Sequence, residues 1–155
     1  MQNLLITFGT RALAQRLSNL LKNEFIIHFA TSEEVPVFLN SKFTPIPIGS
    51  NPTYAHELLK ICLDQHIQVL LPIGLSEIKA LAEAKVLFEE YNIQVLTPSL
   101  GELAELFVLT NPATSVAIHV AYQGQCLDVK KGLNTSLSGV LAVSDDAEDF
   151  ALCVV

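Results

Sequence analysis

The sequence lacks long hydrophobic runs, although 50% of its 155 residues are hydrophobic and the mean hydropathy is +0.43. Its apolar runs, such as Phe25–Ile27 and Val69–Leu71, are only a few residues long. A membrane-spanning helix needs about 20 apolar residues, so we expect no membrane partner. Buried parallel strands explain the high hydropathy instead, because helices cover such strands on both faces.

The sequence also lacks a targeting signal at its N-terminus. No basic region precedes the first apolar run, MQNLLITFGTR, and no small-residue cleavage site follows it. A secretory signal peptide needs both features. We therefore expect this segment to form a first β-strand, and we expect a cytoplasmic location.

Basic residues are few and scattered. The chain has 9 Lys and Arg against 16 Asp and Glu, for a net charge of −7. Residues 1–100 carry 9 acids and 7 bases, and residues 101–155 carry 7 acids and 2 bases. The only basic doublet is Lys130-Lys131. Binding to nucleic acid requires clustered cations that contact phosphates, so we expect no nucleic-acid partner.

Cysteine and histidine show no metal-binding spacing. Cys62, Cys126 and Cys153 are widely separated and form no CxxC pair, and no HxxxH pair occurs. We expect buried free thiols in a reducing compartment, with no metal site and no disulfide. His28 and His119 lie in predicted strands, where we expect core or sheet histidines rather than ligands.

The common cofactor and nucleophile motifs are missing. A GxGxxG fingerprint starting at Gly9 would need glycines at Arg11 and Ala14. The phosphate-binding pattern GxxxxGK and the nucleophile pattern GxSxG are absent as well. The chain alone therefore has no recognisable catalytic residues.

What the sequence does contain is an alternation of short apolar strands and amphipathic helices. We expect strands at 3–7, 25–30, 43–48, 67–71 and 93–97. Helices lie between most of them: from Arg11, from Asn51-Pro52, from after Ser76 to about Tyr91, and from Ser99 to about Val108. Residues 31–34 resemble a capping box, but Pro36 keeps any helix there short. Pro45 and Pro47 mean that the third strand lies at an edge or is loosely paired. Alternation of this kind predicts a parallel sheet.

The pattern changes after Asn111-Pro112. We expect strands at 115–122 and 125–129, joined by a Gln123-Gly124 turn, and two more at 140–143 and 150–155. The predicted fold class is therefore α/β: a mostly parallel, Rossmann-like sheet flanked by helices, with a β-rich C-terminal extension. We divide the chain into a domain at 1–110 and an extension at 111–155 packed on that domain.

Two loops follow predicted strands and are the candidate site, because parallel sheets bind ligands at the carboxyl ends of their strands. The first contains Gly9, Thr10 and Arg11, where a helix N-terminus and a guanidinium can hold an anion. The alternative is a tight turn with a solvated arginine.

The second loop contains Gly74, Ser76 and Glu77, where a carboxylate can accept hydrogen bonds from an amine or hydroxyl. The alternative is that Ser76 caps a helix and Glu77 complements its dipole. We expect the first and fourth strands to be neighbours, so that both loops face one cleft.

Three segments together resemble the N-terminal, pre-ATP-grasp domain of ATP-grasp ligases, and most of all the carbamoyl-phosphate-synthetase-like members. They are LLITFGTRALAQRLSNLL, PIPIGSNPTYAHELLKICLDQHIQVLLPIGLSE and LAEAKVLFEEYNIQVLTPS. The resemblance covers residues 2–102, about two thirds of the chain. It implies a Rossmann-like domain that packs against an ATP-grasp module and helps to hold the acceptor substrate.

Carried over by position, the resemblance implies that the six loop residues line the substrate cleft, with no catalytic and no metal-binding residue in this chain. ATP and Mg²⁺ would bind only with an ATP-grasp module, which residues 103–155 are too few to supply. The implied partners are a small-molecule acid or amine and an ATP-grasp module or chain, and a homodimer stays open. The first turn has fewer glycines than in many members of the family. This difference puts in question whether the turn can bind a phosphate.

Three interpretations of function follow. The chain is the substrate-side domain of an ATP-grasp-type ligase, as a fragment or as a separate subunit. Alternatively, it is a non-catalytic ligand-binding or regulatory domain of the same fold. The third interpretation is a small enzyme of another Rossmann branch that uses a nucleotide cofactor, which selective binding of NAD(P) would favour.

Overall fold

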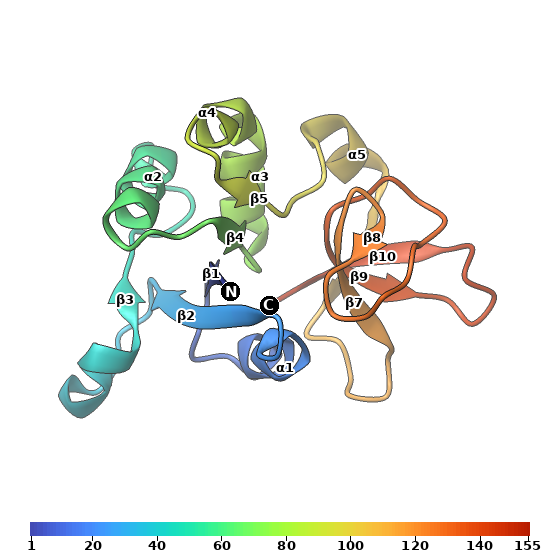
Figure 1. Cartoon of the computed structure of the whole chain (residues 1–155), viewed down its shortest axis with the longest axis horizontal. Helices are drawn as coiled ribbons and strands as arrows, with labels where there is room; N and C mark the ends of the chain where they lie inside the picture. The colour runs from blue at the N-terminus through green and yellow to red at the C-terminus, as the bar shows by residue number, and fades with distance from the viewer.

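The computed structural model describes all 155 residues and is built on two five-stranded sheets (Figure 1). The first sheet has the order β3-β2-β1-β4-β5, and every pair in it is parallel. Its strands are β1 (Gln2–Ile6), β2 (Phe25–Thr31), β3 (Thr44–Pro45), β4 (Val69–Leu71) and β5 (Gln94–Val95). The predicted α/β class and parallel sheet are confirmed, and β1 does lie beside β4.

Helices cover both faces of this sheet. They are α1 (Ala12–Leu21), α2 (Tyr54–Asp64), α3 (Leu75–Glu83) and α4 (Lys85–Glu90), with a 3₁₀ helix η1 (Val37–Lys42) and α5 (Leu100–Glu105) outside the sheet. Alternate residues of a strand point to opposite faces. Leu4 and Ile6 accordingly pack with α1, whereas Leu5 packs with the helices on the other face. Figure 1 shows α1 on one side and α2 to α4 on the other.

The second sheet has the order β6-β10-β9-β7-β8 and is mixed. Its strands are β6 (Phe107–Thr110), β7 (Ile118–Tyr122), β8 (Gln125–Cys126), β9 (Gly139–Val143) and β10 (Phe150–Val154). Only β6 and β10 are parallel. The predicted β-rich C-terminal region is confirmed. Val140 and Cys153 share one apolar core with Leu4 and α1, so the second sheet packs beside α1 on the same face of the first sheet.

The predicted turn at Gln123-Gly124 is confirmed as the two-residue loop of the β7–β8 hairpin, because Tyr122 pairs with Gln125. Both loop residues have positive φ, 48° and 80°. That backbone is typical of the type I′ turn, whose twist matches that of paired strands.

Several expected boundaries are wrong. Asn51 does not begin α2: its side chain accepts hydrogen bonds from Thr53 in a turn, and the helix starts at Tyr54. The single helix expected up to Tyr91 divides at Ala84 into α3 and α4. The capping-box-like segment 31–34 forms no helix, since Thr31 Oγ1 instead accepts from Glu33 N, and η1 begins only after Pro36.

The largest difference lies after α5. The Ser99–Glu102 capping box is present, with both of its hydrogen bonds. The helix nevertheless ends at Glu105 rather than near Val108, and β6 follows at once. A short apolar run such as 106–109 suits either a helix or a strand, and pairing with β10 favours the strand. The second sheet thus takes its first strand from within residues 1–110.

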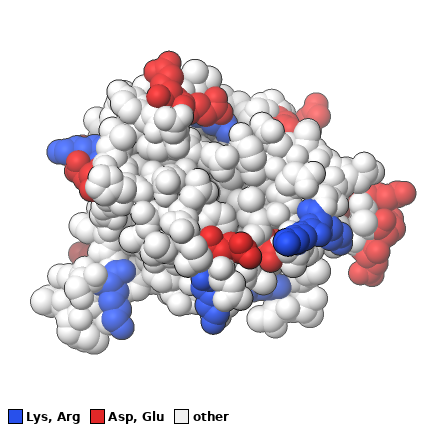
Figure 2. Space-filling view, in the orientation of Figure 1, with Lys and Arg blue, Asp and Glu red and all other residues white.

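No helix of the structure is long and apolar enough to cross a membrane. On the face drawn in Figure 2, the Lys and Arg side chains lie apart from one another, with uncharged surface between most of them. All three cysteines are free thiols. Cys62 and Cys153 are buried as expected, but Cys126 is only partly buried.

Candidate functional site

The loops that follow β1 and β4 lie against each other at the carboxyl edge of the first sheet. Thr7, directly after β1, connects them: its amide N donates to Leu71 O at 3.2 Å, and its hydroxyl oxygen accepts from Ile73 N at 2.9 Å. Strand order reverses direction between β1 and β4, and ligands of parallel sheets bind at such a reversal. The candidate site therefore lies where ligands bind in folds of this kind.

Glu77 is the most unusual residue at this edge. It lies in the first turn of α3, is only 1% exposed, and neither carboxyl oxygen has a hydrogen-bond partner. Burial disfavours the charged form of a carboxyl and raises the pKa of Glu77 to about 7. Thr7, Tyr54 and the backbone of Gly74 are near enough to oppose part of this shift, although none forms a hydrogen bond of normal geometry. Near neutral pH, Glu77 can therefore either accept or donate a hydrogen bond.

Tyr54 places a second unpaired polar group beside Glu77. Its ring is fully buried at the start of α2, and its hydroxyl has no hydrogen-bond partner. Burial, and then the neighbouring Glu77 charge, raise the pKa of Tyr54. Buried polar groups are nearly always hydrogen-bonded. Two unpaired groups at the same edge therefore indicate a place where a water or a ligand supplies the missing bonds.

Gly49 and Gly74 lie so close to neighbouring atoms around Glu77 that neither position has room for a side chain. A Cβ atom on Gly49 would lie 2.5 Å from the backbone N of Glu77 and 2.6 Å from Ser76 Oγ. A Cβ atom on Gly74 would lie 2.3 Å from the Phe8 ring and 3.2 Å from Glu77 Oε1. Loops after β1, β3 and β4 thus close over the carboxyl, and the ring of Phe8 covers Gly74.

Phe8 reaches this position through an unusual backbone conformation. Its φ is +48°, which side chains other than glycine and asparagine rarely adopt. Such conformations cost about 1–3 kcal/mol and gather at functional sites. The guanidinium of Arg11 lies 5.7 Å from the centre of the same ring. Phe8 therefore separates the buried Glu77 from the exposed Arg11.

Arg11 forms its own ion pair at the surface. Nε and Nη2 each donate to Glu33 at 2.9 Å, and Thr10 Oγ1 donates to the same carboxylate at 3.1 Å. The side chains of Arg11 and Glu33 are 45% and 34% exposed. The hydrogen bond from Arg11 lowers the pKa of Glu33. An anionic ligand would have to displace Glu33 to reach Arg11.

The six predicted site residues therefore divide into two groups. Thr10 and Arg11 bind Glu33, and Gly9 packs against Phe29, where a Cβ atom would approach to 2.6 Å. Gly74 and Glu77 belong to the buried cluster of polar groups around Tyr54, while Ser76 is exposed. Ser76 does not cap α3, because Gly74 is the N-cap residue. The two loops are adjacent, but the structure does not bring Arg11 and Glu77 to one surface.

Sequence reasoning missed Thr7, Gly49 and Tyr54 as site residues. One signal was available: Gly49 and Tyr54 both follow the third predicted strand, whose carboxyl end lies at the same edge as those of β1 and β4. A separate group with metal-ligand chemistry, His119, Cys126 and Asp128, lies in the second sheet.

The fold and this edge define an α/β protein with a parallel sheet, a second mixed sheet and a buried acidic group at a strand-order reversal. No protein-family model matches the sequence. No curated protein matches it either. The resemblance to pre-ATP-grasp domains therefore stays a prediction, and the residues of the site are the remaining basis for a function.

Proposed function

We propose that this chain is a Rossmann-like ligand-binding domain that holds an amine at Glu77, acting as the substrate-side domain of an ATP-grasp-type ligase. The parallel order β3-β2-β1-β4-β5 supports the Rossmann-like part of the proposal. The observation that carries the proposed binding is Glu77, a carboxyl with two unpaired oxygens at the reversal of strand order.

An amine fits this position better than an acid does. A buried carboxylate accepts hydrogen bonds only, and an ammonium or amide group supplies the donors that its oxygens lack. A carboxylic acid would bring a second negative charge close to Glu77. Arg11, the group suited to an acid, already has Glu33 as its partner.

Access to Glu77 requires a small movement. The carboxyl is 1% exposed, and the ring of Phe8 lies over Gly74 beside it. Phe8 is only partly buried and has a strained backbone, so we expect rotation of this ring to open the site. In the ligase, we expect ATP and Mg²⁺ to bind on a separate ATP-grasp module and the amine to be held here.

The test is calorimetric titration of the chain with short primary amines, small carboxylic acids, Mg·ATP and NAD. We expect an amine to bind, with an affinity that rises with pH through about 7, because a bound cation favours the ionised form of Glu77. Glu77→Gln should abolish this binding. Glu33→Gln, which removes an exposed carboxylate, is the matched control and should leave it unchanged.

Other results would contradict the proposal. Binding of an acid that Arg11→Ala weakens and Glu77→Gln does not would move the site to the Arg11–Glu33 surface. Tight binding of Mg·ATP or NAD by this chain would favour a nucleotide-cofactor enzyme. Amine binding without any stimulation of an ATP-grasp chain would favour the alternative, a ligand-binding or regulatory domain that is not part of a ligase.

A further inference from the structure

The β7–β8 hairpin brings three potential metal ligands together on one face of the second sheet. Ala121 pairs with Cys126, and continuing this register places His119 opposite Asp128. Cross-strand partners share a face, and so do residues two apart on one strand. One ligand atom from each of His119, Cys126 and Asp128 lies within 4.8 Å of the others.

The hairpin holds these side chains in place. His119 Nδ1 and Asp128 Oδ2 are 2.9 Å apart, and Asp128 Oδ1 accepts from Val120 N at 3.0 Å. Backbone hydrogen bonds from Cys126 N to Lys131 O and from Leu127 N to Val120 O hold the segment that carries Cys126 and Asp128. The Asp128 side chain is 2% exposed and that of His119 is 20% exposed. These ligands are therefore positioned by the fold rather than by long mobile side chains.

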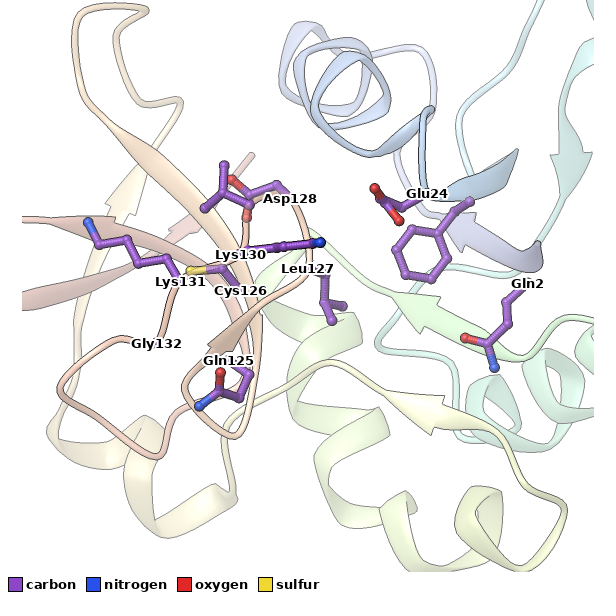
Figure 3. Close-up of a pocket in the computed structure, with 11 residues that line it drawn as sticks. Gln2, Glu24, Gln125, Cys126, Leu127, Asp128, Lys130, Lys131 and Gly132 are labelled. Carbon is purple, nitrogen blue, oxygen red and sulfur yellow. The ribbon is translucent and has the colours of Figure 1, made fainter.

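The hairpin segment that carries Cys126 and Asp128 also forms one wall of a cavity between the two sheets. Cys126 and Asp128 line a cavity of about 860 Å³, whose opposite wall includes Gln2, Glu24 and Phe25. Figure 3 shows Glu24 across the cavity from Asp128, with the Lys130 side chain extending between them. In the same view the Cys126 sulfur points away from Glu24, whereas the Leu127 side chain points toward the opposite wall, so the potential ligand atoms lie on the other face of the hairpin.

We propose that His119, Cys126 and Asp128 bind a divalent zinc ion, with a water in the fourth coordination position. A thiolate, an imidazole and a carboxylate are the donor types that zinc takes, and three protein ligands with one open position are typical of exchangeable zinc sites. The ion would lie between His119 Nδ1 and Asp128 Oδ2, in place of the proton that they share. Tetrahedral coordination puts ligand atoms roughly 3 to 4 Å apart. The His119 and Asp128 atoms, now 2.9 Å apart, therefore separate slightly, and the Cys126 sulfur moves closer by about 1 Å or less.

Binding requires the thiol proton to leave. The Cys126 S–H bond breaks, the sulfur forms a bond to zinc, and the proton passes to the solvent. Burial and then the nearby Asp128 raise the pKa of Cys126, and Lys131 opposes this shift. A cation between sulfur and carboxylate removes the repulsion between them. This site is independent of Glu77, which lies at the carboxyl edge of the other sheet.

The experiment is titration of the chelator-treated chain with Zn²⁺ by calorimetry and with Co²⁺ by absorption. We expect one ion per chain, proton release, and with Co²⁺ a thiolate-to-cobalt charge-transfer band. Cys126→Ser should remove the band, and Cys126→Ser, His119→Gln and Asp128→Asn should each weaken Zn²⁺ binding at least about tenfold. Cys62→Ala removes a thiol from the other side of the molecule and should change neither result.

A second measurement keeps the proposal testable if a variant fails to fold. In amide NMR spectra of the unaltered chain, Zn²⁺ should shift signals of β7, β8 and Asp128. Equal Zn²⁺ affinity in Cys126→Ser and in the unaltered chain would overturn the proposal. So would shifts confined to the other histidines, or an absence of binding at a tenfold excess of the ion.

Discussion

One buried carboxyl group lies beside each sheet, and the two groups differ in their hydrogen bonds. Beside the parallel sheet, Glu77 of α3 has no hydrogen-bond partner for either oxygen. In the mixed sheet, Asp128 accepts from the Val120 amide and pairs with His119. An unpaired carboxyl tolerates burial by taking up a proton, whereas a paired one can stay charged. The difference shows that burial alone does not identify the role of an acidic residue; its partners do.

The two regions also differ in how well a glycine can be replaced by alanine. A replacement in the second sheet has the largest effect on stability that we expect. Gly124 has φ +80°, and an added Cβ atom would lie 2.0 Å from the carbonyl oxygen of Thr135. Gly124→Ala should therefore cost about 3 to 4 kcal/mol, from left-handed strain and overpacking. Gly74→Ala meets the far end of the Phe8 ring, which can move, and should cost about 1 kcal/mol. Urea unfolding measures both, and equal costs would contradict this difference.

The pH dependence of stability tests whether Glu77 is buried without a partner. Its pKa is about 7 in the folded chain and 4.5 as the reference value. Because the folded pKa is raised, its contribution to stability is fully present below about pH 4.5 and is lost as the pH rises through 7. A shift of this size corresponds to about 3 kcal/mol.

The measurement compares the unaltered chain with Glu77→Gln. Between about pH 4 and pH 8, we expect the unaltered chain to lose about 3 kcal/mol of unfolding free energy relative to the variant. Other groups titrate equally in both proteins and cancel in the difference. A difference that is flat with pH would show that Glu77 has solvent or a partner that keeps it charged.

Asp128 should show the behaviour of a paired group. Asp128→Ala leaves the Val120 amide and the His119 ring without their acceptor and should cost about 2 kcal/mol. Asp128→Asn keeps an oxygen for Val120 and should cost about half as much. Urea unfolding at constant pH measures both. If the asparagine variant were as unstable as the alanine variant, the carboxylate charge rather than the Val120 hydrogen bond would be the stabilising feature.

The exposed ion pair gives the smallest effect. Arg11 and Glu33 form two hydrogen bonds, but both side chains are more than a third exposed. Exposed pairs contribute between about 0 and 1 kcal/mol, so Arg11→Ala should lower the unfolding free energy by less than about 1 kcal/mol. Added salt should shrink this loss further. A larger, salt-independent loss would indicate that the contact of Arg11 with Phe8 matters more than its charge.

The sequence predicted the strand and helix order of the first sheet well, because its signals are local. Short apolar runs flanked by turn residues predicted β1, β2 and β4. Of the two positions that Pro45 and Pro47 left open for β3, at an edge or loosely paired, the structure has the edge. The Gln123-Gly124 turn predicted the hairpin. Boundaries failed where two structures suit the same residues, as at Asn51 and at residues 106–109, because distant pairing or a local turn then decides.

The candidate sites were predicted less well. Glu77 was identified from its place after a strand, but nothing local indicates that its oxygens stay unpaired. Arg11 was expected to face the same cleft, and Glu33, distant in sequence, became its partner instead. The three potential metal ligands have no known spacing in sequence. They come together only through the register of the β7–β8 hairpin, in which His119 lies opposite Asp128.

Hydrophobic periodicity and turn residues act over a few positions, so the fold class, the strand–helix alternation of the first 100 residues and the β-rich character of the rest follow from local sequence. Three features depend instead on the folded chain: Phe107–Thr110 joins the second sheet, this sheet shares a core with α1, and only one of the two buried carboxyls has partners. Those outcomes depend on contacts between segments far apart in the chain. Such contacts set the charge and accessibility of a side chain, so the chemistry of a site can be inferred only from the folded chain.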